Sequence, residues 1–94
     1  MMQRQGERLL LSGAVTLGNV AALLDEGRRH IGEGVRRVDL GAVTELDSAL
    51  LALLLAWLRE ARAHEASLEF ERPPEALRTI ARLYGVDTLI PVGS

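Results

Sequence analysis

The feature that most limits the fold is a run of ten apolar residues, 49–58, directly after Asp47 and Ser48. At about 100° per residue, a helix over this run has three apolar faces. These faces hold Leu51, Leu54, Leu55 and Leu58; Leu50, Leu53 and Trp57; and Ala49, Ala52 and Ala56. A helix lying on one side of a sheet needs only one apolar face, which we assign to the first group. The second face therefore needs a separate explanation.

Two explanations for the face of Leu50, Leu53 and Trp57 stay open. The face either packs on a neighbouring helix of the same layer or is exposed for a partner protein. Full burial of a Leu or Trp side chain contributes about 1.5–3 kcal/mol, and Trp is common at the centre of protein interfaces. Solvent exposure of Trp57 distinguishes the two.

Hydrophobic periodicity and turn residues predict the remaining elements. We expect strands at residues 1–5, 8–15, 35–43 and 67–71, and helices from 16 or 19 to 32, from 48 to 64 and from 73 to 85. The order β-β-α-β-α-β-α predicts one α/β domain over residues 1–94, with a mixed, mostly parallel sheet of about four strands. Residues 41–47 read as a connecting loop. Residues 86–92 read as a short strand or an apolar lid.

Composition excludes several classes of protein. There is no cysteine, so disulfides and thiolate metal sites are excluded. The 11 basic residues are outnumbered by 13 acidic ones and form no stripe, which argues against a nucleic-acid partner. The apolar run is shorter than the roughly 20 residues of a membrane-spanning helix, so we expect no direct membrane insertion.

Ser48 has two roles open to it. It stands at the start of a helix, where it or Asp47 can act as the N-cap, and an exposed hydroxyl there can also be phosphorylated. We find no catalytic residues, because neither histidine can be placed near Ser48 from the sequence. Glu45 and Asp47 are too few ligands to define a metal site, and no glycine-rich phosphate loop indicates a cofactor. We therefore expect a protein that is not an enzyme.

The segment VDLGAVTELDSALLALLL, residues 38–55, resembles the signature of STAS domains, which include anti-sigma-factor antagonists and cytoplasmic domains of sulfate transporters. LLLSGAV, residues 9–15, and RPPEALRTIARLYGV, residues 72–86, resemble the second strand and the last helix of that family. Antagonists usually read Asp-Ser-Ser/Thr-Gly-Leu, whereas Ala49 and Leu50 stand here in place of the second hydroxyl and the glycine. The leucine-rich run and residues 81–86 are instead similar to the MlaB branch.

The resemblance implies a cytoplasmic STAS subunit, held at the inner membrane of a Gram-negative bacterium. Its partner would be the ATPase of an ABC transporter that moves phospholipids between the two membranes, and through the ATPase the permease. An anti-sigma-factor antagonist, or another phosphorylation-switched partner protein, is the alternative. The expected partner-binding residues are Thr44, Glu45, Asp47, Ser48, Ala49, Leu50, Ala52, Leu53 and Trp57.

Overall fold

The computed structural model describes residues 1–93 and has a five-stranded sheet whose strands follow the order of the chain. β1 (Met2–Gln5) runs antiparallel to β2 (Arg8–Val15), and the strands that follow are parallel to β2. They are β3 (Arg37–Leu46), β4 (Glu69–Glu71) and β5 (Val92–Gly93). The predicted mixed, mostly parallel sheet is confirmed. The two-residue β5 comes from the tail that we expected to form a short strand or a lid.

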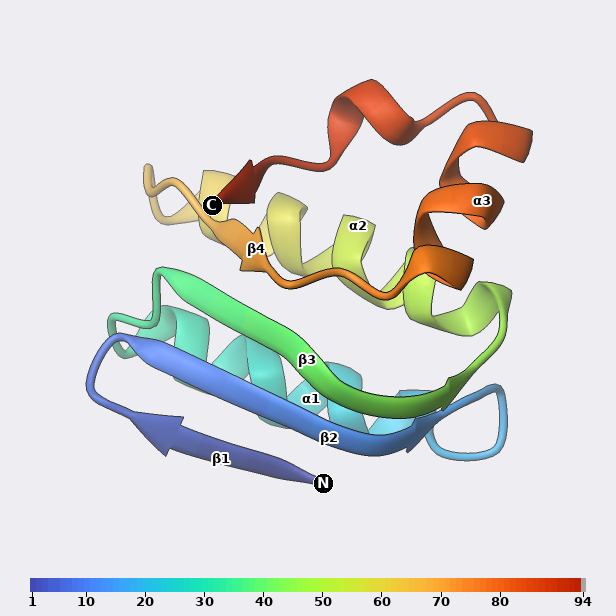
Figure 1. Cartoon of the computed structure of the whole chain (residues 1–94). Helices are drawn as coiled ribbons and strands as arrows, with labels where there is room; N and C mark the ends of the chain where they lie inside the picture. The colour runs from blue at the N-terminus through green and yellow to red at the C-terminus, as the bar shows by residue number, and fades with distance from the viewer. Residues whose placement is uncertain (94) are drawn as a thin grey trace.

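Three helices connect the parallel strands, as predicted: α1 (Val20–Gly32), α2 (Ser48–Ala63) and α3 (Glu75–Leu83). A short 3-10 helix, η1 (Asp87–Leu89), precedes β5. In Figure 1, α1 lies behind strands β2 and β3 and α2 lies behind β4, and these two helices contact each other. Within residues 1–93, no helix is long and apolar enough to cross a bilayer.

The two faces of the sheet differ because the side chains of a strand alternate. Leu9 and Leu11 of β2, with Val38 and Leu40 of β3, are fully buried under the helices. Arg8, Asp39 and Glu71 lie on the other face, which no helix of the described chain covers in Figure 1. This open face is lined by ion pairs between strands, including Arg8 of β2 with Glu71 of β4, a pair that spans β3.

β3 extends to Leu46, so the prediction of a loop over residues 41–47 is wrong for all but Asp47. The pairing of β2 with β3 shifts register twice: Leu10 pairs with Asp39 but Ser12 with Ala42, and Gly13 pairs with Val43 but Ala14 with Glu45. Such β-bulges let a strand continue past residues that break its regular pattern. Gly41 lies in the first bulge, beneath the guanidinium of Arg72, where a Cβ atom would collide.

All three helices end in a Schellman motif, in which an amide beyond the helix bonds to a carbonyl of its last turn. The bonds run from Val35 N to His30 O at 3.1 Å, from Ala66 N to Ala61 O at 2.9 Å and from Val86 N to Ala81 O at 2.9 Å. The residue with positive φ is Gly34 in α1 and Gly85 in α3, but Glu65 in α2. Glycine is therefore absent from one of three positions that favour it.

Candidate partner-binding site

The expected site residues gather where β2 and β3 end and α2 begins. Thr44 and Glu45 lie near the end of β3 and are exposed. Ser48, the first residue of α2, is exposed as well. Ala52 is exposed one turn further along the same helix. Four of the nine expected partner-binding residues thus share one accessible end of the molecule.

Asp47, not Ser48, caps α2. Its backbone is extended, with φ −136° and ψ −168°, and its Oδ1 atom accepts a hydrogen bond from the amide of Ala49 at 2.8 Å. Of the two residues predicted as possible caps, Asp47 is therefore the one that holds, because Ser48 already lies inside the helix. Within residues 1–93, no hydrogen bond engages the Ser48 hydroxyl, which leaves it accessible to solvent.

The second carboxylate oxygen of Asp47 reaches another element. Oδ2 accepts a hydrogen bond at 3.1 Å from the amide of Leu17, in the loop between β2 and α1. Asn19 closes this loop from the other side, since its Nδ2 donates to the carbonyl of Ala14 at 2.8 Å and its Oδ1 accepts from the amide of Thr16 at 3.0 Å. The two β-to-α connections are thus joined into one surface.

Leu17 is an exposed residue at this end of the molecule that the sequence analysis did not include. It reads as the first apolar position of the helix, but α1 begins only at Val20, and the Leu17 side chain is 80% exposed. The signal available in the sequence was the Gly18-Asn19 pair, which is typical of a turn. An exposed leucine beside Ser48 gives this end of the molecule an apolar element.

The face formed by Leu50, Leu53 and Trp57 is internal. Leu50 and Trp57 are fully buried and Leu53 is 1% exposed. The indole of Trp57 packs on Gly27 of α1, and its Nε1 donates to the carbonyl of Leu24 at 3.3 Å. Of the two explanations, packing within the helix layer is therefore the one that holds.

The assignment of four residues to the partner surface is accordingly corrected. Leu50, Leu53 and Trp57 belong to the core, and the indole of Trp57 fits there because α1 has a glycine, Gly27, at the point of contact. Ala49 is 8% exposed and belongs with them, since the first turn of α2 faces inward at that position. The candidate site that remains consists of exposed side chains held in place by Asp47.

Two hydrogen-bonded ion pairs lie instead on the open face of the sheet. Arg72 donates to Asp39 through Nε, at 3.0 Å from Oδ1, and through Nη2, at 2.7 Å from Oδ2. This bidentate pair holds the pKa of Asp39 below its ordinary value of 3.8, and the amide of Gly41 acts in the same direction. Arg8 and Glu71 form a second pair at 2.8 Å, which raises the pKa of Arg8. The two pairs brace β2, β3 and β4.

Residues 1–93 contain no cluster of acidic and histidine side chains that could hold a metal ion. The end carrying Ser48 offers two hydroxyls, one free carboxylate and apolar side chains. Such a set can form hydrogen bonds and apolar contacts with another protein.

Comparison with solved structures finds proteins with a similar fold. The chain is similar to the unphosphorylated form of the anti-sigma factor antagonist SpoIIAA, with a TM-score of 0.73 and 16% identity over 100% of this chain and 87% of that chain. A putative anti-sigma factor antagonist from Thermotoga maritima gives a TM-score of 0.76 with 13% identity, over 98% of this chain and 83% of that chain. The phosphorylated form of SpoIIAA from Bacillus gives 0.68 with 16% identity, over 100% and 90%.

At these identities the solved structures show a shared fold. A comparison with the sequences of curated proteins gives no match. The family model described as "Mlab, STAS domain" matches residues 1–91, nearly the whole chain. This chain therefore belongs to the MlaB-type STAS domain family.

Proposed function

We propose that this chain is a non-enzymatic subunit that binds the ATPase of an ABC transporter moving phospholipids between the inner and outer membranes of a Gram-negative bacterium. The observation that carries the proposal is the MlaB-type family match over residues 1–91. The subunit works in the cytoplasm, where it is attached to the inner membrane through the ATPase and the permease. It requires no cofactor.

The docking surface consists of the exposed residues Leu17, Thr44, Glu45, Ser48 and Ala52. Leu17 supplies apolar area, while Thr44 and Ser48 supply hydroxyls and Glu45 a carboxylate. A matching partner surface has an apolar pocket for the leucine and N–H or cationic groups beside it. A binding subunit changes the activity of an ATPase only if it binds one conformation more tightly than another. The subunit therefore favours the conformation that receives Leu17 best.

A second function is favoured by one observation at Ser48. Its hydroxyl is exposed, and the two SpoIIAA structures that share this fold are an unphosphorylated and a phosphorylated form. An anti-sigma-factor antagonist switched by phosphorylation of Ser48 is the corresponding candidate. Two residues count against it, since Ala49 and Leu50 replace a hydroxyl and a glycine of the usual motif and both are buried.

Identification of the bound partner separates the two functions. The full chain, tagged and expressed from its own promoter, is crosslinked in cells and purified from detergent extract, and mass spectrometry identifies what accompanies it. We expect an ABC ATPase and its permease. Recovery of a serine kinase and a sigma-factor-binding protein, with phosphate on Ser48, would overturn the proposal and establish the alternative.

A matched pair of variants locates the surface. Leu17 and Leu83 are both 80% exposed, but Leu83 ends α3 and lies outside the docking surface. We expect Leu17→Glu to weaken the complex about tenfold or more, because burying an unpaired carboxylate is unfavourable. Leu83→Glu should leave the affinity unchanged. Equal effects of the two variants would show that the docking surface is elsewhere.

A further inference from the structure

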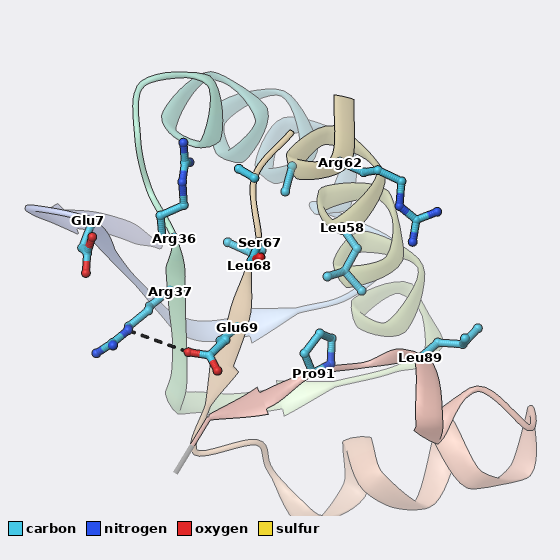
Figure 2. A pocket seen from close by; sticks show the side chains of 12 residues that line it. Glu7, Arg36, Arg37, Leu58, Arg62, Ser67, Leu68, Glu69, Leu89 and Pro91 are labelled. Atoms are coloured by element: carbon cyan, nitrogen blue, oxygen red, sulfur yellow. Dashed lines mark ion pairs between the residues drawn. The ribbon is translucent and has the colours of Figure 1, made fainter. Parts of the chain in front are cut away.

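A pocket of about 600 Å³ lies at the far end of α2 from Asp47. It opens where α2 ends and where β3 and β4 begin. Figure 2 shows its labelled side chains, which come from the last turns of α2, from the starts of β3 and β4 and the loops before them, from the turn between β1 and β2, and from the end of η1 and the segment after it. The volume is in the usual range for small-molecule sites. None of its residues belongs to the docking surface.

The inner wall of the pocket is apolar. It is made of Leu58, Ala61, Ala66, Leu68, Leu89 and Pro91. Leu58 and Pro91 face each other across the pocket in Figure 2, and Leu89 is 60% exposed. Apolar side chains that line a concavity are stabilised when a ligand covers them and removes them from water, whereas isolated apolar side chains on a convex surface are common and need no such cover. The wall therefore favours a ligand with an apolar part.

The edge of the pocket carries three arginines, Arg36, Arg37 and Arg62, against two carboxylates, Glu7 and Glu69. The excess is one positive charge. In Figure 2, Arg37 is directed to Glu69, Arg36 points away from Leu58 and Pro91, and Arg62 extends outward from α2. This balance matches a ligand with a single negative charge better than a dianion such as a phosphate monoester.

The three arginines differ in how strongly they are held. Arg36 donates through Nη1 to the carbonyls of Val35 at 2.7 Å and Ile31 at 3.2 Å. Arg37 lies 4.0 Å from Glu69. Arg62 is exposed and makes no ion pair with a carboxylate within residues 1–93. Arg62 can therefore turn to a ligand without breaking an ion pair.

We propose that this pocket binds a small organic monoanion, a carboxylate carrying an alkyl chain. The chain lies along Leu58, Leu89 and Pro91, and the carboxylate accepts two parallel hydrogen bonds from the guanidinium of Arg62. The exposed hydroxyl of Ser67 is a further donor at the rim. The ligand site is independent of the proposed ATPase contact, because it stands at the opposite end of α2.

Octanoate and its neutral analogue octanamide have the same alkyl chain, so the two probes test whether the ligand must carry a negative charge. Binding to the full chain is followed by titration of backbone amide NMR signals, which also reports where each probe binds. We expect octanoate to bind about tenfold more tightly than octanamide, as a hydrogen bond to a charged group allows. The shifted signals should belong to residues 58–69 and 89–91.

Arg62→Gln should abolish most of the preference for octanoate and leave octanamide binding unchanged. Arg59→Gln is the matched control, since Arg59 is exposed on the same helix but does not line the pocket. It should preserve both affinities. Equal affinity of the wild-type chain for the two probes, an unchanged preference in Arg62→Gln, or shifts confined to another part of the protein would each overturn the proposal. None of these results bears on the ATPase partnership, which crosslinking tests separately.

Discussion

The carboxylate of Asp47 accepts a hydrogen bond from the amide of Leu17 at 3.1 Å while it caps α2 through the amide of Ala49. One side chain therefore fixes both the start of a helix and a loop that precedes another helix. Asp47→Ala should lower the free energy of unfolding by about 1–3 kcal/mol, since a lost cap costs about 0.5–2 kcal/mol and a lost hydrogen bond about 1 kcal/mol. Urea denaturation measures this difference.

Ser48→Ala is the natural comparison for Asp47→Ala. The serine hydroxyl is exposed and does not cap the helix, so the substitution should change stability by less than about 0.5 kcal/mol. If both variants lose stability equally, the hydroxyl contributes to the helix start in solution and the assignment of the cap to Asp47 alone fails.

Two glycines of α1 should respond to alanine with opposite signs. Gly27 is buried against the indole of Trp57, and a Cβ atom there would overlap the ring. Gly27→Ala should therefore destabilise the domain by about 1–3 kcal/mol, which is typical of overpacking. At Gly32 the nearest atom to an added Cβ is His64 Nε2, at an ordinary 3.5 Å. Gly32→Ala should stabilise by up to about 1 kcal/mol through helix propensity, and thermal unfolding of the pair checks both signs.

Glu65 offers a stabilising substitution. Its φ of 55° is left-handed, a conformation that costs an L residue about 1–2 kcal/mol and glycine almost nothing. The added freedom of glycine in the unfolded chain offsets part of the gain, so Glu65→Gly should stabilise by about 0.5–1 kcal/mol. Gly85→Ala, at the same position of α3, should destabilise by a similar amount. A less stable Glu65→Gly variant in chemical denaturation would contradict the prediction.

The pair of Asp39 with Arg72 makes part of the stability dependent on pH. Because the folded state lowers the pKa of Asp39 below 3.8, the carboxylate stabilises the fold above that value. The contribution is lost as the pH falls through the still lower pKa of the folded protein. Asp39→Asn should thus be less stable than wild type at about pH 7, and the difference should shrink at about pH 3.

Asp25→Asn controls for the general effect of removing an acidic residue. Asp25 is exposed and takes part in no ion pair of the described residues. Its substitution should change stability little at either pH. A gap between Asp39→Asn and wild type that stays constant with pH would mean that the ion pair does not carry the effect.

Local signals in the sequence were sufficient for the order of elements. Periodicity predicted all three helices and glycines predicted the ends of α1 and α3, because these features depend on neighbouring residues. The length of β3 was underestimated, since Gly41 reads as a turn, whereas the pairing of β3 with β2 on both sides of a bulge continues the strand through it. The buried position of the Trp57 side chain likewise depends on Gly27, a residue thirty positions away in the chain.

The candidate site was predicted in part for the same reason. Thr44, Glu45 and Ser48 were expected near the start of the helix, and the structure places all three there with exposed side chains, while their role in binding stays a prediction. Leu17 was not included, because its amide donates to the carboxylate of Asp47, thirty residues further along the chain, and such a contact is not visible in local sequence signals. Periodicity shows that a helix has two apolar faces, but the packing partner of each face is a property of the tertiary structure.

The side chain of Asn19 has a consequence for how fast and how tightly a partner can bind. Ordering a flexible loop residue on association costs about 1–2 kcal/mol of conformational entropy. Asn19 and Asp47 already hold the backbone of the loop that carries Leu17. The proposed partner would therefore have little backbone entropy to remove from this loop on binding.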